Sequence, residues 1–128
     1  MARAKMGASY GWNGNYVESA TASFSLEVGD SGKVFVLKDA AVTVTLPSLS
    51  DIEAGFKVKL ISGDDSEHVL AGGDSKIYGQ IGDFAAGNWE RIAAASGYTL
   101  GTGEIGDWLE LISDGTNWYI SGMTDNGA

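Results

Sequence analysis

The chain has 128 residues, 19 glycines, one proline and no cysteine, a length at which a domain buries its own hydrophobic core. The lack of cysteine excludes disulfides, thiolate metal ligands and a thiol nucleophile. The net charge of -9 argues against a sequence-independent nucleic-acid binder, which needs a basic face, and no stretch approaches the roughly twenty apolar residues that span a bilayer.

The first twenty residues differ from the rest of the chain. They are mostly small, lack a period of 2 or 3.6, and include two basic and three aromatic side chains: Arg3, Lys5, Tyr10, Trp12 and Tyr16. A segment of this kind either packs along its own domain or becomes ordered on a partner. The sequence therefore predicts an N-terminal arm over residues 1–20 and a β-rich domain over residues 21–128.

From residue 24 onward, apolar and polar residues alternate in short runs, as in strands with one buried face. These runs cover residues 24–28, 33–37, 42–46 and 56–60. Pro47 ends the third run because proline offers no N–H to a strand ladder. In the fourth run, Lys57 and Lys59 are expected to point outward, which would discourage pairing at a sheet edge.

The segments between these runs predict turns. Ser48–Gly55 fits one helical turn, with Ser50 as its cap and Glu53 as the capping-box partner. Short apolar runs near residues 68–70 and 76–78 are separated by turns rich in Gly and Asp. Residues 89–98 fit either a helical turn by propensity or a strand by their surroundings.

The segment Asp107–Gly122 has the pattern of a complete β-hairpin. Alternating residues in DWLELIS lead to an Asp-Gly-Thr-Asn loop, after which Trp118, Tyr119 and Ile120 begin a second strand. Many short strands, no long helix and no clear internal repeat predict an all-β protein. The expected architecture is a small antiparallel β-sandwich or barrel with an extended N-terminal arm.

Few side chains suggest catalytic or metal chemistry. Asp64, Asp65, Glu67 and His68 form the densest ionisable cluster and supply oxygen ligands of the kind calcium takes, but the spacing is not that of an EF-hand. Because acidic residues beside glycine are common in turns, a solvated hairpin turn is the favoured interpretation. His68 is the only histidine, and a strand-edge position without a task is favoured over a general base.

Two carboxylate pairs could be posed as a glycosidase pair, because the sequence does not exclude a suitable separation: Glu104 with Asp107 and Glu110 with Asp114. Nothing in the sequence singles either pair out, and so small a chain leaves little room for a substrate cleft beside its core. We therefore expect no enzymatic activity, no cofactor and no metal.

The aromatic residues allow two interpretations. Flat rings stack on sugars, and four candidates for such a face are Trp89, Trp108, Trp118 and Tyr119. Core packing is favoured, because large aromatics supply much of the buried area in small β domains. If Trp108 and Trp118 instead face outward on paired strands, they are expected to contact another subunit.

Several segments together resemble small β-rich virion proteins of tailed bacteriophages, a group that includes capsid decoration (cement) proteins and modules of head or tail fibres. The similarity covers roughly residues 24–122. Its segments are DSGKVFVLKDAAVTVTLP, GFKVK, HVLAGGDSKIYG and DWLELISDGTNWYISG.

The resemblance implies a non-catalytic protein that binds the major capsid protein on the outside of the head, often as a homotrimer, and stabilises the lattice. It implies a virion location after assembly in the host cytoplasm, without nucleic-acid or membrane contact. The arm would carry the capsid contacts, and the expected capsid or subunit interface residues are Arg3, Lys5, Tyr10, Trp12, Tyr16, Trp108 and Trp118. The alternative is a fibre module that binds a receptor or a host-surface glycan.

Overall fold

In a computed structural model, which describes residues 17–83, 87–102 and 104–124, most of the chain is β-strand, and the prediction of an all-β protein is confirmed. The strands are β1 (Val17–Ala20), β2 (Phe24–Ser25), β3 (Val34–Leu37), β4 (Thr43–Thr45), β5 (Lys57–Ser62), β6 (Glu67–Ala71), β7 (Ile77–Asp83), β8 (Asn88–Ala95), β9 (Tyr98–Thr102), β10 (Trp108–Ser113) and β11 (Trp118–Thr124). Two short 3-10 turns, η2 (Val28–Asp30) and η3 (Leu49–Asp51), join some of them.

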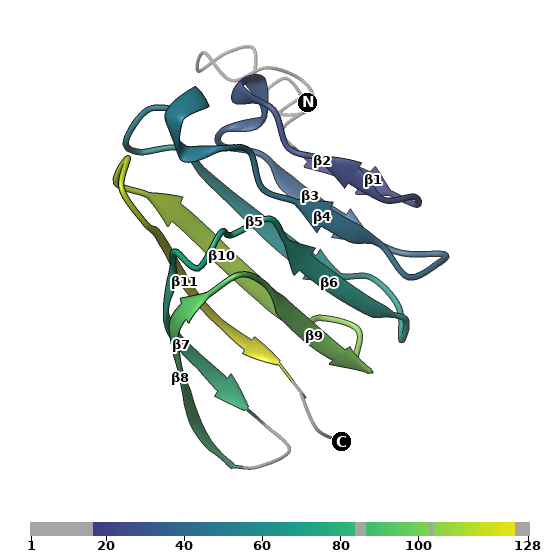
Figure 1. Cartoon of the computed structure of the whole chain (residues 1–128). Helices are drawn as coiled ribbons and strands as arrows, with labels where there is room; N and C mark the ends of the chain where they lie inside the picture. The colour runs from purple at the N-terminus through teal and green to yellow at the C-terminus, as the bar shows by residue number, and fades with distance from the viewer. Residues whose placement is uncertain (1–16, 84–86, 103, 125–128) are drawn as a thin grey trace, which may run out of the picture.

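The strands form two sheets (Figure 1). The large sheet has the order β1-β3-β5-β10-β11-β7-β8, and the small sheet has the order β2-β4-β6-β9. From β1 to β6 the chain alternates between the two sheets, and neighbouring strands of this part are parallel within each sheet. The first half of the domain is therefore a coil of three turns, followed by the hairpins β7–β8 and β10–β11.

The prediction of antiparallel sheets is wrong in this respect, because both sheets are mixed and neither closes into a barrel. When the chain crosses to the opposite sheet and then returns, its next strand in the first sheet runs in the original direction, so the two neighbouring strands are parallel. A hairpin instead reverses the chain direction and makes its two strands antiparallel. Alternation in the sequence has no direction and cannot distinguish the two. The turns of the coil also differ in length, since Val17 pairs with Val34 and Val34 pairs with Lys59, so no repeat of constant period is visible.

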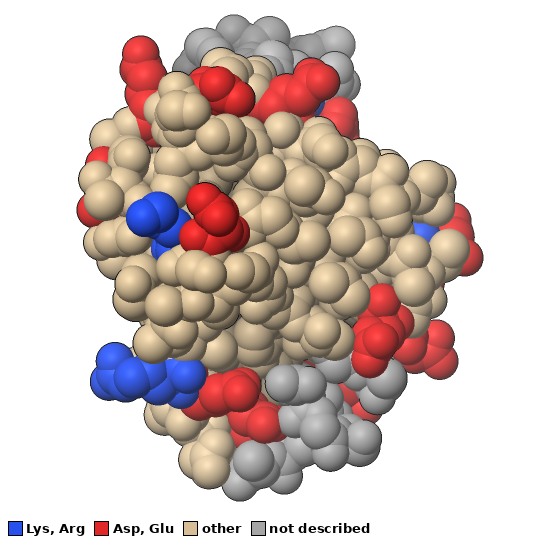
Figure 2. Space-filling view, viewed as in Figure 1, with Lys and Arg blue, Asp and Glu red and all other residues tan. Residues whose placement is uncertain are grey.

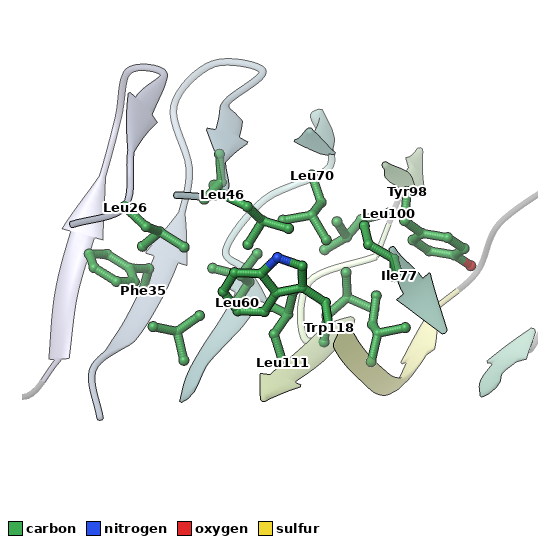
Figure 3. Close-up of a cluster of buried hydrophobic side chains, with 14 of the residues drawn as sticks. Leu26, Phe35, Leu46, Leu60, Leu70, Ile77, Tyr98, Leu100, Leu111 and Trp118 are labelled. Atoms are coloured by element: carbon green, nitrogen blue, oxygen red, sulfur yellow. The ribbon is translucent and has the colours of Figure 1, made fainter. Parts of the chain in front are cut away.

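One hydrophobic core lies between the two sheets (Figure 3). Both sheets contribute fully buried side chains, among them Leu37, Leu60, Ile81 and Leu109 from the large sheet and Val44, Leu70 and Leu100 from the small sheet. Trp118 is 0% exposed and packs edge-on against Phe56, with ring centroids 5.7 Å apart. Each such side chain contributes about 1.5–3 kcal/mol through removal of apolar area from water.

Several local predictions need revision. The strand at residue 24 ends after two residues, and Val28 lies in η2 at 62% exposure. Ser48, not Ser50, stands at the cap position of η3. Residues 88–95 are the strand β8, so the strand interpretation of this segment is correct. The last four residues of the predicted arm form β1 and pair with β3.

The predicted hairpin is confirmed as β10 and β11, with Ser113 opposite Trp118. Its loop is organised by the Asp114 carboxylate, which accepts hydrogen bonds from the N–H groups of Asn117 (2.8 Å) and Thr116 (2.9 Å) and from the Tyr119 hydroxyl (3.0 Å). The backbone N–H groups of Asn117 and Thr116 lower the pKa of Asp114. Gly115 adopts φ +90°, which glycine accepts without steric cost.

Candidate functional site

The side of the large sheet that faces away from the core, called the outer face here, carries most of the exposed apolar side chains. Alternation places Trp118 and Ile120 in the core and turns Tyr119, Ser121 and Met123 outward. Among the described residues, six of the eight exposed large hydrophobic side chains lie on this face: Val17, Tyr78, Trp89, Ile112, Tyr119 and Met123. An apolar patch that extends over several strands is typical of an interaction surface.

Strand register aligns these side chains in rows across the sheet. One row runs from β3 to β8 and consists of Val36, Ile61, Trp108, Met123, Gly82 and Trp89. A Cβ on Gly82 would lie 2.6 Å from the sulfur of Met123 and 3.4 Å from Cζ3 of Trp89. Glycine at this position therefore lets the methionine and tryptophan side chains pack over the strand.

A second apolar row consists of Ile112, Tyr119 and Tyr78, which are 45%, 40% and 37% exposed. A largely polar row separates the two and consists of Val34, Lys59, Glu110, Ser121, Gln80 and Arg91. The outer face thus alternates apolar and polar rows at the spacing of two residues along each strand.

The outer face also differs in charge from the rest of the molecule. The chain has 17 Asp and Glu against 8 Lys and Arg, yet the described strands place Lys57, Lys59 and Arg91 on this face against one carboxylate, Glu110. The ammonium of Lys59 lies 4.9 Å from the ring centroid of Trp108, within range of a cation–π interaction. Apolar and basic side chains are therefore concentrated on the same surface.

A groove of about 440 Å³ lies on the outer face where β3, β5, β10 and β11 run side by side. Its lining includes Lys57, Lys59, Glu110, Ile112 and Tyr119. The groove is only half enclosed, so it suits a protruding segment of a partner better than a small molecule that needs a closed cavity.

The opposite side of the molecule, formed by the small sheet, has a different character. Its strands present short, half-buried side chains: Thr43, Thr45, Val69, Ala71 and Thr99. Figure 2 shows this side largely free of charge over β4 and β6, with Asp, Glu, Lys and Arg around its margin. Among the described residues, the large exposed aromatic side chains therefore lie on the outer face of the large sheet.

The predicted interface residues have different outcomes. Trp118 is 0% exposed and belongs to the core, so the prediction that it faces a neighbouring subunit is wrong. Trp108 lies half-buried on the outer face. The five predicted interface residues of the N-terminal segment lie outside the described residues: Arg3, Lys5, Tyr10, Trp12 and Tyr16.

The acidic cluster around His68 lies where β5 of the large sheet leads to β6 of the small sheet, so the predicted turn is solvated but is not a hairpin turn. Asp64 is half-buried, Asp65 and Glu67 are exposed, and only His68 of the cluster is buried. His68 is 0% exposed on β6, which lies between β4 and β9, so the expectation of a strand-edge histidine without a task is wrong. Its Nδ1 accepts a hydrogen bond from the backbone N–H of Val42 (3.1 Å), which leaves Nε2 to donate to Asp64 Oδ1 (3.0 Å). Within residues 17–83, 87–102 and 104–124, no group of His, Asp and Glu is arranged to hold a metal ion.

Asp64 receives further hydrogen bonds from its own β5–β6 turn and from the loop between β3 and β4. The backbone N–H groups of Ser66 and Asp39 donate to its carboxylate. These bonds, first of all the one from Ser66, lower the pKa of Asp64, and the bond from His68 acts in the same direction. The carboxylate therefore ties the turn to the adjacent strands.

The two carboxylate pairs lie in turns and on the sheet surface. Glu104 and Asp107 close one turn, in which the N–H of Asp107 donates to the carbonyl of Glu104 (3.2 Å). Glu110 is exposed on the outer face, and Asp114 organises the hairpin loop.

Sequence reasoning missed Tyr78, Ile112 and Met123 as surface candidates. The sequence pattern that could have revealed them is a strand with apolar residues at both odd and even positions, as in Trp108–Ile112. Such a strand has apolar side chains on both sides of its sheet, and only one side was needed for the core.

Among the described residues, no helix has the length and hydropathy needed to cross a membrane. No protein-family model matches the chain, and no curated protein matches it.

Proposed function

We propose that the protein is a non-catalytic capsid decoration protein of a tailed bacteriophage, which binds the outer surface of the head lattice and stabilises it. The observation that carries the proposal is the concentration of six exposed large hydrophobic side chains on the outer face of one sheet. The resemblance of residues 24–122 to phage virion proteins supplies the kind of partner, the major capsid protein.

In this proposal the two sheets act as a small sandwich, and the segment before β1 acts as an arm that reaches the capsid. The subunits assemble as homotrimers, without a cofactor and without nucleic-acid or membrane contact. Trp, Tyr, Met and Arg are over-represented in protein interfaces, and the outer face offers Trp89, Tyr119, Met123 and Arg91. A few anchors of about 2 kcal/mol each, repeated over a symmetric lattice, give tight attachment through multivalency.

The test is co-sedimentation of the full-length chain with undecorated heads of the parent phage. We expect binding at a fixed ratio to the major capsid protein, and we expect a variant with Trp89→Ser and Met123→Ser to bind far more weakly. Val28→Ser is the matched control, because Val28 is also 62% exposed but lies outside the outer face. Absence of binding by the unaltered chain would remove the proposal.

The contribution of the arm is measured separately with Arg3→Glu and Lys5→Glu in the full-length chain. Weaker binding of this variant, with the outer-face variant unaffected, would assign the capsid contact to the arm. Weaker binding of both variants would assign it to the two surfaces together.

A fibre module that binds a receptor or a host-surface glycan is the second candidate. The observation in its favour is that Trp89 is 64% exposed and shares the outer face with Tyr78 and Tyr119, since flat aromatic rings stack on sugars. Titration of tryptophan fluorescence with host-surface polysaccharide tests it. A saturable change that Trp89→Ser abolishes, without binding to heads, would favour this candidate over the first.

A further inference from the structure

Two turns of the chain share the sequence Glu-Val/Ile-Gly-Asp and present an aliphatic side chain to solvent. They are Glu27–Asp30 and Glu104–Asp107, and each precedes a strand of the large sheet. In both turns the N–H of the aspartate donates to the carbonyl of the glutamate, at 2.9 and 3.2 Å. Val28 and Ile105 are 62% and 76% exposed, the only exposed large hydrophobics of the described residues outside the outer face.

The turn at Ile105 is held in a fixed shape. The N–H of Gly106 donates to the carbonyl of Ser62 at the end of β5 (2.8 Å), and Gly106 has φ +103°. Ile105 therefore protrudes from a rigid support beside the carboxylate of Glu104. A preorganised segment loses little conformational entropy when a partner binds it. We call Glu104–Gly106 the knob.

The groove on the outer face complements the knob in polarity and charge. It offers apolar surface from Ile112 and Tyr119 and the ammonium groups of Lys57 and Lys59. Within the part of the chain that the structure describes, neither lysine makes an ion pair. Glu110 also lines the groove and opposes an incoming carboxylate, so the two lysines leave it net positive.

Knob and groove lie at opposite ends of the same strand. The knob immediately precedes β10, whereas the groove is lined by the third to fifth residues of that strand, Glu110, Leu111 and Ile112. Because a strand of this length spans about 20 Å, a chain cannot place its own knob in its own groove. Val28 lies at the groove end, since Gly32, which follows its turn, lines the groove.

We propose that the groove receives the Ile105 knob of a second copy of this chain, in a head-to-tail contact along the strand direction. Face-to-face pairing of two outer faces would instead bring Lys57, Lys59 and Arg91 of one copy toward those of the other. A head-to-tail contact is heterologous, so it closes into a ring or continues as a filament according to the rotation between copies. This contact between copies does not depend on the proposed function as a capsid decoration protein, because it forms without a capsid.

The test is sedimentation velocity of the purified full-length chain over a concentration series that reaches the millimolar range. We expect concentration-dependent association that Ile105→Ser weakens about tenfold or more, as for the loss of one buried side chain. Val28→Ser is the matched control and should associate like the unaltered chain. Lys57→Glu should weaken association as well, whereas Lys76→Glu, outside the groove lining, should not.

Circular dichroism and the urea midpoint of each variant verify that the fold is intact. A monomer at all concentrations would overturn the proposal, and so would equal effects of Ile105→Ser and Val28→Ser. Association that only Trp89→Ser or Met123→Ser disrupts would also overturn it, in favour of face-to-face pairing. These results do not depend on binding to heads, so failure here and failure of the proposed function are separable.

Discussion

The inner and outer sides of the large sheet are built from the same strands but have different roles. Trp118 and Tyr119 are neighbours in β11, yet the first is 0% exposed and the second is 40% exposed. The inner phase of the alternation buries apolar area against the small sheet and stabilises the domain. The outer phase has apolar side chains that the fold itself does not bury, and this exposure is the basis of our proposal that the outer face contacts other molecules.

The largest contrast is expected between two tryptophans. Trp118→Ala removes a fully buried ring that packs against Phe56 and should lower the free energy of unfolding by about 3–5 kcal/mol. Trp89→Ala, at 64% exposure, should lower it by less than about 1 kcal/mol. Urea unfolding followed by circular dichroism measures both. Similar losses for the two variants would contradict the division between the two sides.

Loss of the hydrogen bonds of His68, which faces the core from the small sheet, is expected to lower the stability by a smaller amount. His68→Phe leaves the buried N–H of Val42 without its acceptor and should lower the free energy of unfolding by about 1–3 kcal/mol. Glu67→Gln, on the exposed phase of the same strand, is the control and should change stability little. An unchanged urea midpoint for His68→Phe would show that this hydrogen bond is dispensable.

Acid should weaken the turns that the two aspartates organise. Because hydrogen bonds lower the folded-state pKa of Asp64 and of Asp114, both carboxylates stabilise the fold above the pKa of an unfolded aspartate. Their contribution is lost as the pH falls through the lowered folded-state values. Thermal unfolding between pH 7 and strong acid should therefore show a fall in Tm that is shallower for Asp64→Asn. A parallel pH profile for that variant would contradict this account.

The smallest expected effect is a gain in stability at the outer edge of the large sheet. Ala94 has φ +51° in β8, where the register between β7 and β8 shifts. Since alanine is strained in this region and glycine is not, Ala94→Gly should raise the free energy of unfolding by about 0.5–1 kcal/mol. Differential scanning calorimetry measures the shift. A fall in Tm would show that the bulge tolerates alanine without strain.

Local alternation in the sequence predicted the strands well, but their neighbours could not be predicted. The hairpin at residues 107–122 was predictable because its turn chemistry is contiguous in the sequence. The pairing of β5 with β10 joins residues far apart in the chain, and no local signal specifies it. For the same reason, the parallel coil of β1–β6 was not expected.

The same limit applies to the candidate interaction surface. The register of four strands brings Trp89, Met123 and Trp108 into one row, and no two of these residues are close in the sequence. The burial of Trp118 on β11 also depends on the small sheet, and the burial of His68 on β6 depends on the large sheet, because each sheet covers the inner side of the other. Which aromatic residue is core and which is surface was therefore undetermined until the sheet order was known.

The central claim is that the outer face of the large sheet is an interface, and hydroxyl-radical footprinting of the chain on phage heads tests it most directly. In the free protein, Trp89, Tyr119 and Met123 should be oxidised readily, whereas Trp118 should be unreactive in both states and serves as the internal reference. On heads, we expect strong protection of the three exposed side chains. Equal oxidation of Trp89, Tyr119 and Met123 in the free and head-bound protein would contradict the claim.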